Sequence, residues 1–191
     1  MTALSDFYSY LITDPKFYSS DPTVFRQKLA QAFSNHEVSM ACFRDKISSN
    51  FEELAMSFLQ TCANFGIKKT FINQRLDVAN KLKANGVHLT SGQFGEITKA
   101  KALGLEVFIS CHSLADIELA QNLGADFATI SPIFHSPNKG EPIGIHVLEE
   151  AKKIATTTKI IALGGIDTKE KVEIIKSSDA DGFASIRYFA N

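Results

Sequence analysis

The sequence lacks a cysteine framework, a long apolar run and an excess of charge of either sign. Its three cysteines, Cys42, Cys62 and Cys111, are far apart and form no Cys-x-x-Cys pair, which argues against a disulfide scaffold and a zinc site. No apolar run approaches the ~20 residues of a transmembrane helix. The net charge is −1, so neither nucleic acid nor an anionic membrane is expected as a partner.

The first fifteen residues contain no Lys or Arg and no continuous apolar block, so no signal peptide is expected. The 191 residues, 45% of them hydrophobic and 21% charged, have the composition of an average globular protein and can bury a substantial core. We therefore expect a cytoplasmic protein that forms a single domain over residues 1–191.

Short β-rich runs alternate with helical patterns along the chain. Strands are expected at Tyr8–Thr13, Val38–Phe43, Thr70–Asn73, Gly86–Leu89, Glu106–Cys111, Phe127–Ile133, Lys159–Leu163 and Gly182–Ile186. Helices are expected to follow the N-cap residues Asp21, Asn50, Ser113 and Asp167. The strands are too apolar for a sheet with one solvated face, which favours a parallel sheet covered by helices.

Eight strands and seven helices in this order predict a short (β/α)8 barrel. No Gly-x-Gly-x-x-Gly follows the first strand, which argues against a dinucleotide-binding fold. The sequence ends soon after the eighth strand, so the final helix is expected to be missing. A neighbouring subunit or the N-terminal segment should then cover the apolar flanks of strands 1 and 8. A homodimer is the expected assembly.

In such barrels the active site lies at the carboxyl ends of the strands. Gly164 and Gly165 follow the seventh strand, and Ile186 and Arg187 follow the eighth, where backbone N–H groups and one cation could hold a phosphate. A tight turn with a solvated arginine is the alternative.

Two further segments could bind an anion. Arg44 and Lys46 are two residues apart at a strand end and point the same way, although a solvated pair would have the same spacing. The loop SPIFHSPNKG offers Ser136, Asn138 and Lys139, and its composition suits an ordinary surface loop equally well.

The segments CFRDK, FINQRLDVA, GVHL, ISCHSLADIELA, GADFATISPIFHSPNKG and IIALGGI, taken in order, resemble the thiamine phosphate synthase and TenI family from about Val38 to Phe189. The resemblance implies a small barrel in thiamine biosynthesis. Members with synthase activity join a hydroxymethylpyrimidine diphosphate to a thiazole phosphate, with magnesium carrying the diphosphate.

This sequence departs from the synthase pattern at three places. The glutamine that holds the pyrimidine is Cys42, and the two aspartates that hold magnesium are Gln74 and Gln93. An amide brings no charge to a magnesium site, which usually needs one or two carboxylates. No metal and no cofactor are therefore expected, and magnesium only if synthase activity is retained, with Glu96 or Asp45 as substitute ligands.

The acid-free loop LTSGQF looks more like the TenI branch, whose members include thiazole tautomerases that need no metal. The histidine of that reaction falls on Pro132 here, so His135 and His112 are the candidate replacements, with His88 read as a core residue. The leading prediction is thus a tautomerase or close relative that binds thiazole phosphate.

Two alternatives stay open. One is a synthase that binds its substrates through Arg44, Lys46, Asn73, Ser136 and Lys139, with Ser110 as a further contact. The other is a non-catalytic ligand-binding or regulatory protein of the same pathway.

Overall fold

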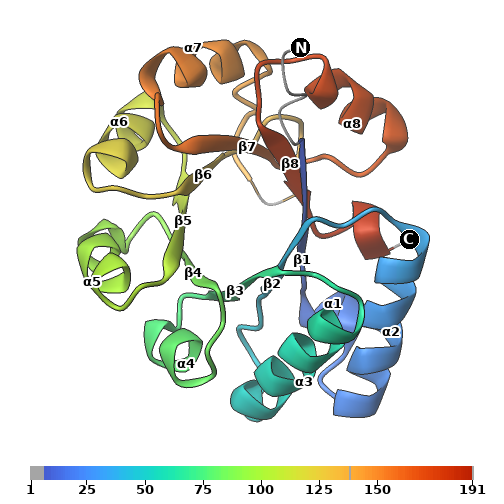
Figure 1. Ribbon diagram of the computed structural model, residues 1–191. Helices are drawn as coiled ribbons and strands as arrows, with labels where there is room; N and C mark the ends of the chain where they lie inside the picture. Colours follow the sequence, from blue (N-terminus) through green and yellow to red (C-terminus); the bar gives the residue numbers. More distant parts are fainter. Residues whose placement is uncertain (1–6, 138, 191) are drawn as a thin grey trace, which may run out of the picture.

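The computed structural model describes residues 7–137 and 139–190, and its core is a closed barrel of eight parallel strands in sequential order (Figure 1). The strands are β1 (Tyr8–Ile12), β2 (Met40–Phe43), β3 (Lys69–Asn73), β4 (Gly86–Leu89), β5 (Glu106–Cys111), β6 (Phe127–Ile130), β7 (Lys159–Leu163) and β8 (Gly182–Ser185). The prediction of a (β/α)8 barrel is confirmed.

Helices form a ring outside the strands, as Figure 1 shows. They are α1 (Pro15–Tyr18), α2 (Pro22–Asn35), α3 (Phe51–Asn64), α4 (Leu76–Lys81), α5 (Ile97–Ala102), α6 (Leu114–Asn122), α7 (His146–Ile154) and α8 (Lys169–Lys176), with 3-10 turns η1 (Phe94–Glu96) and η2 (Tyr188–Ala190). Among residues 7–137 and 139–190, no helix has both the length and the apolar character needed to cross a bilayer.

The predicted helix starts are right at three places, and the fourth is displaced by one residue. Asp21 Oδ1 accepts hydrogen bonds from the first turn of α2, and Ser113 forms the expected capping box at α6. The N-cap of α8 is Thr168 rather than Asp167, because the Asp167 carboxylate binds Lys171 instead. Asn50 is the N-cap residue of α3 as predicted, but its side chain makes no capping hydrogen bond, and its Nδ2 donates to Ser20 O.

The barrel interior is filled by layers of side chains from alternate strands. One layer comes from the odd-numbered strands and consists of Tyr10, Phe71, Phe108 and Ile161. Its rings pack tightly, with the Tyr10 and Phe108 centroids 4.4 Å apart and nearly parallel. Two residues further along each of these strands, the inward positions are Ile12, Asn73, Ser110 and Leu163. This upper layer faces the carboxyl end of the barrel.

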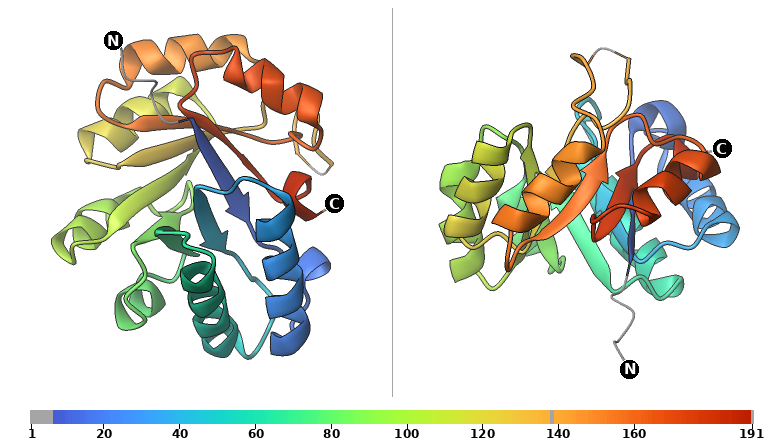
Figure 2. Two further views of the ribbon diagram at one scale, coloured as in Figure 1. Left: turned by 45° about the vertical axis from the view of Figure 1, so that its right-hand side comes forward. Right: turned by 90° about the horizontal axis from the view of Figure 1, so that it is seen from above.

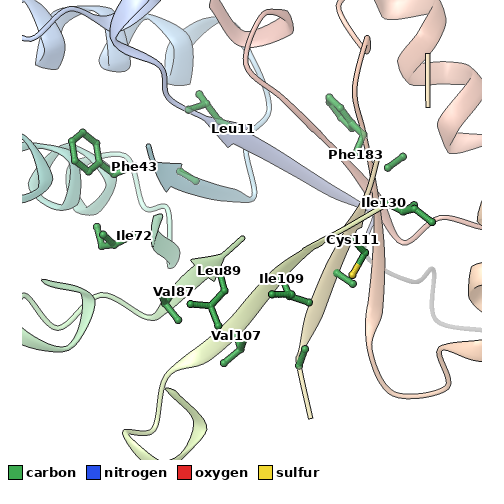
Figure 3. Packing of buried hydrophobic residues seen from close by; sticks show 14 of the residues in the cluster. Leu11, Phe43, Ile72, Val87, Leu89, Val107, Ile109, Cys111, Ile130 and Phe183 are labelled. Carbon is green, nitrogen blue, oxygen red and sulfur yellow. The ribbon is translucent and has the colours of Figure 1, made fainter. Parts of the chain in front are cut away.

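The larger core lies between the strands and the helices. Outward-facing residues of the strands, including Leu11, Phe43, Val87, Ile109 and Phe183, project away from the barrel axis towards the helices (Figure 3). The apolar character of both faces of each strand is explained by these two cores, one inside and one outside the barrel.

The flank of β8 is covered by the chain itself. Phe183 stacks on Phe7 at 6.1 Å and on Phe189 at 5.6 Å between ring centroids. Phe189 belongs to η2 and is only 1% exposed, and η2 packs on α2 in the gap that a last helix would fill (Figure 1). The N-terminal segment was one of the two elements expected to cover this flank, and it contributes Phe7. The rest of the flank is covered by η2, which the sequence analysis did not predict.

The amino ends of the strands are joined in pairs by one repeated contact. In each contact the acceptor is a side-chain oxygen of the residue just before an even-numbered strand. The donor is the backbone N–H of the second residue in the odd-numbered strand that precedes it. The pairs are Ser39 with Ser9 (2.9 Å), Asn85 with Thr70 (3.1 Å), Asp126 with Val107 (2.7 Å) and Asp181 with Ile160 (2.7 Å). We call these contacts the four staples. They satisfy the hydrogen-bonding capacity of backbone N–H groups at the amino end of the barrel, opposite the site.

Candidate functional site

Among the cavities at the carboxyl ends of the strands, two adjoin each other across the barrel mouth. The first has a volume of about 400 Å³ and the second of about 330 Å³. Ser136, Lys139, Leu163, Gly164 and Ile186 line both, so the cavities share a wall. The connection from β6 to α7, which supplies Ser136 and Lys139, extends beyond the strand ends (Figure 2).

The floor of the first cavity is the upper layer of the barrel, Ile12, Asn73, Ser110 and Leu163. Asn73 is held in place because its Nδ2 donates to His88 O at 2.9 Å. Arg44, Lys46, His112 and Ser131 complete the walls from neighbouring strand ends. The predicted contacts Arg44, Lys46, Asn73, Ser110, Ser136 and Lys139 are therefore brought together around one space.

The second cavity is built on the backbone after β7 and β8. Gly164 and Gly165 have φ angles of +98° and +71°, which side chains rarely adopt. A Cβ on Gly165 would lie 2.4 Å from His135 O, so the β6–α7 connection also depends on this glycine. Gly164, Gly165, Ile186 and Arg187 all line the cavity, as the phosphate prediction requires.

Cations outnumber carboxylates around the two cavities. The lining cations are Lys16, Arg44, Lys46, Lys139 and Arg187, and the lining carboxylates are Asp14 and Asp167. Both carboxylates are already paired, Asp14 with Arg44 and Asp167 with Lys171. The two cavities therefore present a net positive potential that suits an anionic ligand.

A buried polar chain runs below the first cavity. His88 Nδ1 lies 3.0 Å from Tyr10 Oη, and His88 Nε2 lies 3.1 Å from Ser110 Oγ. Burial lowers the pKa of His88 to about 3, with the Arg44 charge as a smaller cause, so the ring is neutral at ordinary pH. A neutral imidazole has one donor and one acceptor nitrogen, which the two hydroxyls can match. His88 thus orients Ser110, which lines the cavity.

Two other expectations concern nearby groups. Cys42 is fully buried, and burial raises the pKa of its thiol to about 12, so it stays protonated and serves packing.

His112 lines the first cavity, with Nδ1 3.0 Å from Ser131 O. His135 is exposed and is absent from the described residues that line either cavity. The structure thus places one of the two candidate histidines in the site. Asn138 lies outside the described residues.

The donor groups expected around magnesium do not fit that ion. Gln93, where the resemblance implies an aspartate, has its amide committed to hydrogen bonds with Thr90 and with Gln74 O. Of the possible substitutes, Asp45 Oδ1 accepts from two backbone N–H groups at 2.9 Å, and Glu96 pairs with Lys99. Among the described residues, no three His, Cys, Asp or Glu side chains gather to hold a metal.

Sequence reasoning missed two residues of the site. Asp14 anchors the Arg44 guanidinium, and Lys171 Nζ donates to Gly165 O at 2.8 Å. His88, expected to be a core residue, is buried and orients Ser110. Asp14 follows β1, so its place at a strand end was the available signal. For Lys171 no signal was available, because its helical spacing reads as an ordinary exposed face.

The fold and the paired cavities define a class, a (β/α)8 barrel with a cation-lined site at its carboxyl end. The family model described as thiamine monophosphate synthase (TMP-TENI) matches residues 9–189. A thiamine-phosphate synthase from Syntrophomonas wolfei is 31% identical over 188 residues, covering 95% of this chain and 88% of that protein. The chain therefore belongs to the thiamine phosphate synthase and TenI family of thiamine biosynthesis.

Two further comparisons agree with this assignment. A protein from Aquifex aeolicus, provisionally named thiamine-phosphate synthase 2, is 37% identical over 121 residues, which cover 62% of this chain and 64% of that protein. The alignment thus spans slightly less than two thirds of that relative. A solved thiamine phosphate pyrophosphorylase from Pyrococcus furiosus superposes with a TM-score of 0.81 at 23% identity, covering 95% of this chain and 86% of that one, which shows the shared fold.

Proposed function

We propose that the protein forms thiamine phosphate from a hydroxymethylpyrimidine diphosphate and a thiazole phosphate. The observation that carries this proposal is the pair of adjoining cavities, about 400 and 330 Å³, with Ser136, Lys139 and Gly164 in their common wall. One small ring in each cavity would bring the two reacting atoms together at that wall. The names of the relatives support this reaction and give no support to the tautomerase that the sequence favoured.

The lining residues divide between the two substrates. Gly164, Gly165 and the backbone near Arg187 would hold the thiazole phosphate, and Arg44 and Lys46 the pyrimidine diphosphate. In the reaction the thiazole nitrogen forms a bond to the pyrimidine methylene carbon. The bond from that carbon to the diphosphate oxygen breaks, and its electron pair leaves with the diphosphate. Lys139, in the common wall, can stabilise that leaving charge.

A second candidate, proton transfer on a thiazole carboxylate phosphate, is favoured by His112. A carbonyl oxygen only accepts, so the contact with Ser131 O places the proton of the neutral ring on Nδ1 and leaves Nε2 as a base. This reaction would need a single occupied cavity.

Product analysis separates the two candidates. Purified protein is incubated with both synthase substrates, with and without MgCl2, and separately with the thiazole carboxylate phosphate. Thiamine phosphate is the expected product, and His112→Gln should still form it. Isomerisation of the thiazole with no coupled product would overturn the proposal, and loss of isomerisation in His112→Gln would establish the second candidate.

We further propose that this reaction takes place in the cytoplasm. The support is the state of Cys42, Cys62 and Cys111, which are all buried free thiols. Unpaired cysteines are typical of a reducing compartment.

A further inference from the structure

The loops after β3 and β4 are joined by the side chain of Gln93. Its Oε1 accepts hydrogen bonds from Thr90 N and Thr90 Oγ1, both at 3.1 Å, and its Nε2 donates to Gln74 O at 3.2 Å. A backbone N–H only donates and a carbonyl oxygen only accepts, so these two partners fix the direction of the amide. We call this contact the amide bridge.

An ionised carboxylate could not make the amide bridge. It only accepts hydrogen bonds, so at residue 93 it would face the carbonyl oxygen of Gln74 with nothing to donate. The two oxygens would repel each other, and a nearby cation would relieve that repulsion. In the synthase pattern that the sequence resembles, acids at positions 74 and 93 would hold magnesium, which would supply such a charge. Here the amide NH2 faces the carbonyl directly, so the loops are joined without an ion.

Side-chain cations surround the space that a diphosphate would occupy. Lys46 and Lys139 line the first cavity, and neither forms an ion pair with another described residue. Arg44 is held in position by Asp14, so only part of its charge is available. Ammonium groups are compact charges that bind phosphate oxygens strongly.

We infer that the first cavity binds diphosphate without a divalent cation, with Lys46 and Lys139 supplying the charge and the amide bridge replacing the ion between the loops. The choice of diphosphate as ligand rests on the proposed function. The amide bridge does not.

Calorimetric titration of inorganic diphosphate into the full chain tests whether the two lysines bind diphosphate without a divalent cation. Binding is expected in EDTA, and excess MgCl2 should not tighten it. Lys46→Ala and Lys139→Ala should each weaken it about tenfold or more. Lys99→Ala is the control, because Lys99 is exposed on α5 and pairs with Glu96. Diphosphate that does not bind in EDTA, or that binds tenfold more tightly with Mg²⁺, overturns the inference.

Thermal unfolding of Gln93→Glu tests the amide bridge. The variant should lower the Tm by several degrees, and MgCl2 should restore part of the loss, while wild type and the exposed control Gln27→Glu do not respond to Mg²⁺. A Gln93→Glu variant with the wild-type Tm, or a wild type that is itself stabilised by Mg²⁺, overturns the inference.

The outcomes also separate this inference from the proposed function. Thiamine phosphate that forms only with Mg²⁺ overturns the metal-free site and leaves the function standing. Metal-free diphosphate binding without any product overturns the function and leaves the metal-free site standing.

Discussion

His88 is buried in the barrel between two hydroxyl groups, those of Tyr10 and Ser110. Its ring stacks on Phe108 with 5.0 Å between centroids, and it is 3% exposed. A charged imidazolium in these surroundings would lose its hydration and gain no carboxylate partner. The residue therefore makes the stability of the protein depend on pH.

The direction of that dependence follows from the pKa values. The folded-state pKa of about 3 lies below the unfolded value, so the unfolded chain binds the extra proton at intermediate pH. Stability is then lost as the pH falls from about 6.5 towards 3, by about 2 kcal/mol between about pH 7 and pH 5. Urea unfolding at both pH values measures the loss, which His88→Gln should largely remove.

His146→Gln is the matched control, because His146 is exposed on α7. It should keep the wild-type loss of stability on acidification. Equal losses in His88→Gln and wild type would show that His88 does not titrate as its surroundings require.

At the scale of elements, the loop after β7 depends on Gly165. Its φ of +71° costs an L-residue about 1–2 kcal/mol, and a Cβ there would contact the backbone of Phe134 and His135. We expect Gly165→Ala to lower the free energy of unfolding by about 1–3 kcal/mol and to weaken phosphate binding in the second cavity. Urea unfolding and a phosphate titration measure the two effects.

Gly95→Ala provides the comparison, since a Cβ on Gly95 would meet nothing within 4 Å. It should leave both quantities close to wild type. Full phosphate affinity in Gly165→Ala would remove this loop from the binding site.

The staples are a second feature of elements. Asp126 Oδ2 accepts from Val107 N at 2.7 Å, and removal of the carboxylate leaves that N–H without its partner in a buried strand. We expect Asp126→Ala to cost about 1–3 kcal/mol and Asp126→Asn less, because the amide oxygen can still accept. The Lys101 pair adds little, since it is partly exposed. Chemical denaturation checks both variants, with the exposed Asp179→Ala as control.

The elements were predictable where the signal is local. The bounds of β4, β5 and β7 match the expected strands. The capping box of α6 was also predictable, because Ser113 and Asp116 lie within four residues of each other in the sequence. The glycines after β7 were also readable, because positive φ angles select that residue.

The site was less predictable, because its decisive contacts join distant residues. Asp14 meets Arg44, and Tyr10 meets His88 78 positions later. His135 was chosen from its place in a loop, and it is exposed and absent from the described residues that line either cavity. Gln93 could be read as a lost acid, but only its two partners reveal what the amide does instead.

At the scale of the whole molecule, Phe189 closes the ring of helices. It is 1% exposed and packs on Phe183 and His36. Phe189→Ala should lower the free energy of unfolding by about 3–5 kcal/mol, since a buried aromatic side chain is removed from a site that cannot collapse fully. Thermal denaturation tests this, and Leu103→Ala, 45% exposed, should have little effect.

The homodimer stays a prediction, and its original reason is weaker. Phe7 and Phe189 already cover the flank of β8 that a second subunit was expected to cover. If Phe189 closes the ring, light scattering of Phe189→Ala should show association beyond that of wild type. An unchanged size together with an unchanged Tm would mean that η2 is not needed for closure.

The four staples have a consequence for motion. Each one protects an amide at the amino end of the barrel, those of Ser9, Thr70, Val107 and Ile160. Strand ends usually fray, so amides at such positions exchange with solvent quickly. Here the four should exchange as slowly as mid-strand amides, while those of the loops around the cavities exchange fast. Local opening of the barrel would then be confined to its carboxyl end, where the two cavities lie.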